Sequence, residues 1–117
     1  MTRIMFSLVT VFILGSFAAA KRVSPKPVAP VELDGIQYSA DGDGRDQYVV
    51  ANDMSDGKEL WRVKVFHNRI KLWMEEDVQW VFIKSMTLGA SGSEILVVNE
   101  KGEKYSLNLV TKEVNKP

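Results

Sequence analysis

Short runs of apolar and β-branched residues, separated by turns that contain Gly, Asp or Asn, recur along residues 31–114 at intervals of roughly 8 to 12 residues. Around Trp61, Val63 and Val65 the apolar positions alternate with polar ones, which is the period of a strand with one buried face. No segment of this region sustains the spacing of an amphipathic helix. We therefore expect an all-β fold built as a small antiparallel sheet assembly of about seven strands.

Turn residues divide this region into its expected strands. Asp34-Gly35 suits a type I′ hairpin because both positions tolerate a positive φ. The irregular segment 67–79 interrupts the strand pattern, and its acidic residues favour a short helical turn near 74–79. Strands are expected at 31–33, 36–38, 47–52, 59–66, 80–88, 94–98 and 104–109.

The first 30 residues differ from the rest in composition. Residues 1–20 combine Arg3, an apolar run and Ala18-Ala19-Ala20, which together are typical of a cleavable secretory signal. Residues 21–30 contain three prolines and predict an extended tether. We expect a periplasmic or secreted protein in which a β domain spans 31–114 and a short tail 115–117 follows.

The charge and the cysteine content of the chain exclude several classes of binding partner and of catalytic site. The formal net charge of the 117 residues is zero, so the chain has no field that would attract nucleic acid, and after signal cleavage no membrane association is expected. With no cysteine and one histidine, the chain lacks the residues for a cysteine nucleophile or a multi-histidine zinc site. His67 could pair with a carboxylate in 75–77, but a lone histidine at a strand end is more often a surface residue.

Two stretches resemble one family pattern, the pyrroloquinoline-quinone-like repeat of quinoprotein β-propellers: a strand, a short acidic turn, then Thr-Gly-Lys-x-x-Trp. Residues 48–61 follow it with Asp56 in place of the threonine, and residues 95–114 follow it with Asn108 in the turn and no glycine after Thr111. The resemblance implies a partial propeller-like assembly of strand-turn-strand units. A propeller ring needs about four to eight blades, so the resemblance does not imply a closed ring here. It also does not imply that this chain binds a quinone cofactor.

An acidic loop at residues 39–47 offers a candidate metal site. Asp41 and Asp43 alternate with glycines before a strand, as in the calcium loop of FG-GAP repeats, and calcium prefers such alternating carboxylates. Ser39 and Gln47, however, are neutral where that family has carboxylates. The alternative is an exposed Asp/Gly turn, because turns select the same residues for backbone reasons. Calcium is therefore the candidate ligand, and no other cofactor is expected.

Aromatic residues provide the candidate binding site. Trp61 and Phe82 are expected in the core, whereas Trp73 and Trp80 flank the acidic segment, where an exposed pair would suit a sugar, a peptide or a second subunit. We assign Trp73, Trp80 and Tyr105 as candidate binding residues.

An open sheet also leaves an edge that can pair with another chain. We place this edge at 104–109, unless the tail or the tether covers it. The sequence thus predicts an exported, non-enzymatic β-sheet module that binds a protein partner or itself, or has a structural role. The alternatives are a calcium-stabilised module and a hydrolase-type enzyme.

Overall fold

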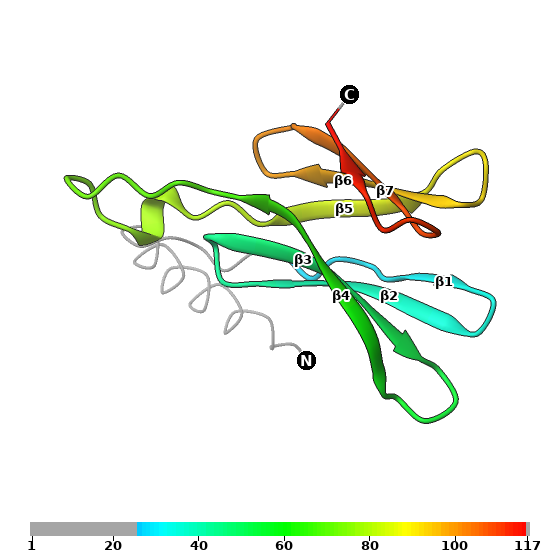
Figure 1. Cartoon of the computed structure of the whole chain (residues 1–117). Helices are drawn as coiled ribbons and strands as arrows, with labels where there is room; N and C mark the ends of the chain where they lie inside the picture. Colours follow the sequence, from blue (N-terminus) through cyan, green and yellow to red (C-terminus); the bar gives the residue numbers. More distant parts are fainter. Residues whose placement is uncertain (1–25, 117) are drawn as a thin grey trace, which may run out of the picture.

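The computed structural model describes residues 26–116, so the expected signal at 1–20 lies outside the described residues. Eight strands form two four-stranded antiparallel sheets, and neither closes into a barrel (Figure 1). This confirms the all-β class and gives one strand more than expected. Within the described chain, no helix has the length and apolar character that a membrane span requires.

The first sheet is an up-and-down meander in which each strand pairs with the next along the chain. Asp34 and Gly35 adopt φ values of 51° and 78° at its first turn, as a type I′ hairpin requires. The register shifts twice where the third and fourth strands pair. Its strands are β1 (Val31–Leu33), β2 (Ile36–Gly42), β3 (Asp46–Asp53) and β4 (Glu59–His67).

The second sheet repeats this order, and its longest strands are shorter than those of the first sheet. It contains β5 (Ile83–Leu88), β6 (Glu94–Asn99), β7 (Lys104–Asn108) and β8 (Val114–Asn115). The strand expected from Trp80 begins only at Ile83, because the amides before it bond outside the sheet. The Trp80 amide donates to Asp77 of a short helical turn, and the Val81 amide donates to Gly44 of the β2–β3 loop. A short 3₁₀ helix, Asp77–Gln79, lies within the expected helical turn.

The prediction that residues 104–109 form an open edge of the sheet was wrong. In the structure β7 lies between β6 and β8, since Val114 and Asn115 pair with Leu107 and Ser106. The end of the chain thus covers this edge, which was the alternative left open. The edge strands of the two sheets are instead β1 and β4, and β5 and β8.

The two sheets bury one shared core. Trp61 and Val63 face this core, as their alternation predicted, although Trp61 is only half-buried. The buried members from β2, β3 and β4 are Tyr38, Val49, Ala51 and Val65, and those from β5, β6 and β7 are Ile83, Met86, Ile95, Val97, Tyr105 and Leu107.

A long connection joins the two sheets. Residues 68–82, which we call the arm, leave β4, extend beyond the ends of the strands and return to β5 (Figure 1). The arm carries Trp73, Trp80 and the acidic segment, so most of the candidate binding residues lie on it.

Candidate functional site

The arm ends in an apolar tip, which we define as Leu72, Trp73 and Met74. Leu72 is 93% exposed and Trp73 is 81% exposed, the two highest values among the large hydrophobic side chains of the described chain. Val78, further along the arm, is also exposed. Sequence reasoning found Trp73 but missed its two neighbours, although three consecutive large apolar residues in an otherwise polar segment were a signal.

Gln79 holds the base of this tip. Its amide nitrogen donates to the carbonyl oxygens of Lys71, Met74 and Glu75 at 2.9, 3.2 and 3.1 Å, while its side-chain oxygen accepts from the backbone N–H of Lys71 at 2.6 Å. One side chain therefore satisfies several backbone groups of the turn. The tip is exposed on a loop whose backbone is fixed from within.

The acidic Asp/Gly loop between β2 and β3 anchors the arm to the first sheet. Gly44 accepts hydrogen bonds from the Val81 amide at 3.2 Å and from the Asn68 side chain at 3.3 Å. Gly44 has a φ of 91°, and a Cβ there would overlap the ring of Trp80. Glycine is thus required both for the backbone conformation and for the close approach of the indole.

An ion pair fastens the same contact. Arg45 donates two hydrogen bonds to Glu76, from Nε at 2.8 Å and from Nη2 at 2.5 Å, and the Trp80 indole N–H donates to Glu76 at 3.3 Å. The Arg45 guanidinium and then the Trp80 indole lower the pKa of the Glu76 carboxyl below its ordinary value. This bidentate geometry restricts the orientation of the arm as well as its distance from the sheet.

The two candidate calcium ligands are both engaged by the protein's own donors. Asp43 accepts from the backbone N–H groups of Asp46 and Arg45, each at 2.9 Å, and these bonds lower the pKa of Asp43. Asp41 accepts from its neighbour Gly42 at 2.9 Å and pairs with Arg62 at 3.2 Å. Among residues 26–116 no group of three or more histidine, cysteine, aspartate or glutamate side chains could hold a metal ion.

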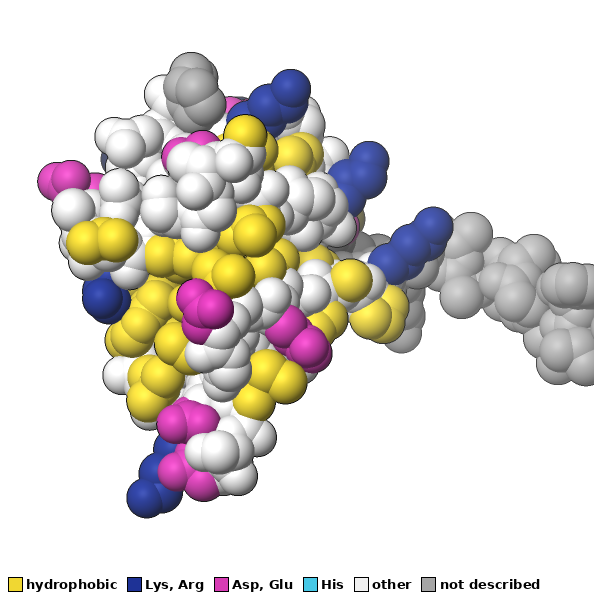
Figure 2. Space-filling view, turned by 90° about the vertical axis from the view of Figure 1, so that its right-hand side faces the viewer, with side chains coloured by type: hydrophobic (Ala, Val, Ile, Leu, Met, Phe, Trp, Pro, Cys, Tyr) yellow, Lys and Arg dark blue, Asp and Glu magenta, His cyan; other side chains and the backbone are white. Residues whose placement is uncertain are grey.

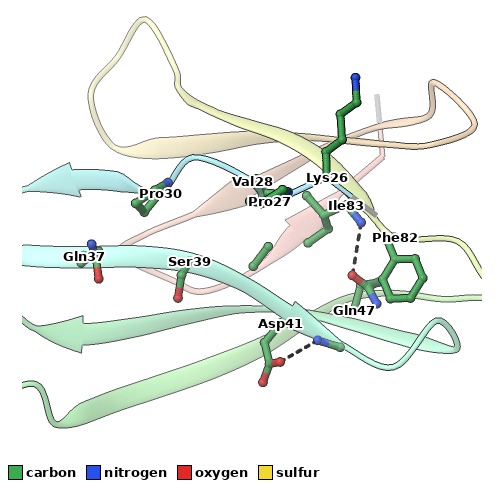
Figure 3. A pocket seen from close by; sticks show the side chains of 12 residues that line it. Lys26, Pro27, Val28, Pro30, Gln37, Ser39, Asp41, Gln47, Phe82 and Ile83 are labelled. Carbon is green, nitrogen blue, oxygen red and sulfur yellow. Dashed lines mark hydrogen bonds between the residues drawn. The ribbon is translucent and has the colours of Figure 1, made fainter. Parts of the chain in front are cut away.

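Asp41 also borders a cavity of about 350 Å³ between the two sheets (Figure 3). Residues 26–30, the second half of the expected tether, form one wall, and Val28 packs against the core. On the opposite side the buried Gln47 side chain accepts a hydrogen bond from the Ile83 amide at 3.2 Å and so links the sheets. The lining combines apolar side chains with two amides, a hydroxyl, one carboxylate and one amine, so it gathers no cluster of charged groups.

The three aromatic candidates lie in different environments. Trp73 is exposed, Trp80 is half-buried against Gly44, and among the described rings the two indoles make no contact with each other. Tyr105 is a buried core residue whose ring stacks on Phe66 at 5.2 Å between centroids. The expected exposed pair of tryptophans is therefore a single exposed tryptophan.

His67 pairs with Asp46 and not with the acidic segment of the arm. Its Nδ1 lies 2.6 Å from Asp46 Oδ1, and this hydrogen bond lowers the pKa of the Asp46 carboxyl. Lys64 also approaches Asp46, at 3.5 Å. The arrangement ties the end of β4 to the start of β3.

A second apolar surface lies at the opposite end of the molecule. Figure 2 shows a band of hydrophobic side chains across the end of the two sheets that carries the β1–β2 turn. Half-buried residues such as Leu33, Ile36 and Leu109 pack against the core from this region. These side chains already have partners within the fold, whereas those of the tip project away from it.

No protein-family model, curated protein or solved structure matches this chain. What the arm does must be inferred from its own residues.

Proposed function

We propose that this chain is an exported, non-enzymatic β-sheet module that binds a protein surface through the tip of its arm. The exposure of Leu72 and Trp73 on a loop fixed by Gln79 carries the proposal. Burial of one large apolar side chain stabilises a protein or a complex by about 1.5 to 3 kcal/mol. The tip side chains are exposed in the fold, so a partner that covers them would gain this free energy. Export is inferred from residues 1–20.

The order of the arm before binding supports the same role. A binding element that is already held in place loses little conformational entropy when it meets its partner. Tryptophan is also enriched among the residues that dominate binding energy at protein interfaces. Leu72 and Met74 beside Trp73 would add apolar area around that anchor.

Site-specific photo-cross-linking in the native host tests the proposal. A photoreactive phenylalanine analogue replaces Trp73 in the full chain, and a matched chain carries it at Val110, which is 77% exposed and lies outside the arm. We expect a discrete cross-linked protein from position 73 and none from position 110. The mass of the product distinguishes another protein from a second copy of this chain.

The captured protein must then bind the purified chain directly. We expect Trp73→Ala to weaken this binding at least tenfold, in line with the roughly 2 kcal/mol or more attributed to interface hot spots. Equal cross-linking from both positions, or unchanged affinity in Trp73→Ala, would refute the proposal.

A further inference from the structure

Two neighbouring cavities open beside the arm. One is lined by the end of β4, the β6–β7 turn and the end of the chain, and has a volume of about 310 Å³. The other lies beneath the arm and has a volume of about 360 Å³. They share Asn68, Arg69, Val81 and Lys101, so we treat them as one feature and call it the basic groove.

Cationic side chains dominate this groove although the whole chain has no net charge. Arg69, Lys71, Lys101 and Lys116 line it, and they come from the arm, the β6–β7 turn and the end of the chain. Segments far apart in the sequence therefore bring positive charge to one place.

The groove's carboxylates already bond within the protein. Glu103 accepts from Asn99 at 2.9 Å and from Lys116 at 3.1 Å, and both contacts lower the pKa of Glu103. Glu100 accepts from the Phe82 amide at 3.1 Å. Arg69 and Lys101 have no carboxylate of the described residues within ion-pair distance, although Lys101 is close enough to Glu103 to lower its pKa further.

Apolar side chains lie at both ends of the groove. Met74 and Val78 border it beneath the arm, and both are exposed. At the other end the stacked rings of Phe66 and Tyr105 line the cavity. Cations accompany these apolar side chains at each end, Lys71 beneath the arm and Lys116 over the Tyr105 ring, while Arg69 and Lys101 lie where the two cavities meet. Such a lining suits a chain segment that carries both acidic and apolar residues.

We propose that the basic groove binds an extended acidic segment of the protein partner, with carboxylates placed on Arg69 and Lys101. This inference rests on the proposed function, because Met74 belongs both to the tip and to the groove. Opposite charges across an interface set orientation and speed association, so the groove would fix how the partner lies on the tip.

A fluorescent hexaglutamate peptide is the probe, and hexaglutamine is its uncharged counterpart. We expect fluorescence anisotropy with the full chain to show at least tenfold tighter binding of hexaglutamate, weakening as salt rises because the contact is electrostatic. The double variant Arg69→Glu, Lys101→Glu should lose this preference. The matched reversal Lys58→Glu, Lys84→Glu, on residues outside the groove, should keep it.

Equal binding of the two peptides, or equal losses in both double variants, would overturn the proposal. So would full displacement of hexaglutamate by equimolar inorganic phosphate, which would indicate a site for free anions, or tighter binding of a short oligothymidylate. If the reversal at Arg69 and Lys101 fails to fold by circular dichroism, the glutamine substitutions at both positions serve instead.

The result of the peptide-binding test can be distinguished from the result of the cross-linking test of the proposed function. Trp73 does not line the groove, so Trp73→Ala should leave hexaglutamate binding unchanged. If the chain binds hexaglutamate but gives no cross-link from position 73, the proposed role of the tip is refuted and the proposed role of the groove is not. The reverse result would refute the groove alone.

Discussion

The three tryptophans of this protein lie in three different environments, and we infer a different role for each. Trp61 faces the core beside Tyr38, with 5.8 Å between ring centroids, and lies under Lys112 at 5.1 Å. Trp80 packs on Gly44 and holds the arm, whereas Trp73 stands at the tip. Truncation of these side chains should therefore affect different properties.

The pair Trp61→Ala and Trp73→Ala tests this division of tasks by urea unfolding. A buried aromatic truncated to alanine costs about 3 to 5 kcal/mol, and because Trp61 is half-buried we expect about 2 to 3 kcal/mol. For the exposed Trp73 we expect a change within about 0.5 kcal/mol. Equal free energies of unfolding for the two variants would contradict the assignment.

The arm depends on a few polar contacts with the first sheet. Glu76 receives hydrogen bonds from Arg45 and Trp80, and Asp43 is the nearby carboxylate that opposes its ionisation. Because the pKa of Glu76 is lowered in the fold, its contribution to stability is present above the pKa of an unfolded glutamate, about 4.3. That contribution is lost as the pH falls through the lower, folded value.

Acid should therefore weaken the contact between the arm and the first sheet. We expect the NMR signal of the Trp80 indole N–H to shift toward its unbonded position as the pH falls from 7 to 3. A Trp80→Phe chain assigns the signal. In Glu76→Gln this acid-dependent step should be absent, so a step of the same size there, or a signal that does not move in the wild type, would show that Glu76 does not control the contact.

At the scale of the whole molecule, the features of the fold that could be predicted from the sequence are those that depend on a local residue pattern. Alternation located the long strands, and the two positive φ values at Asp34 and Gly35 followed from the turn residues. The two-residue β8 was missed because its pairing depends on β7 and not on its own pattern.

The structure of the arm was not predictable in the same way. Asp41 and Asp43 were candidate calcium ligands, with an exposed Asp/Gly turn as the alternative. Neither interpretation predicted that Arg45 in the same loop would pair with Glu76, 31 positions along the chain. The four hydrogen bonds of the Gln79 side chain likewise depend on how the arm folds back on itself. Contacts of this kind leave no periodic signal in the sequence.

An ordered arm that displays an apolar tip is the central claim of this account, and amide hydrogen exchange in the free protein tests it most directly. We expect the amides of Lys71, Gln79 and Val81, which donate to carbonyl oxygens or to the Gln79 side chain, to exchange at least tenfold more slowly than in an unstructured peptide. In Gln79→Ala the Lys71 amide should lose this protection, because its acceptor is the Gln79 side chain, while β6 keeps its own. Exchange of the wild-type arm at the unstructured rate would contradict the claim.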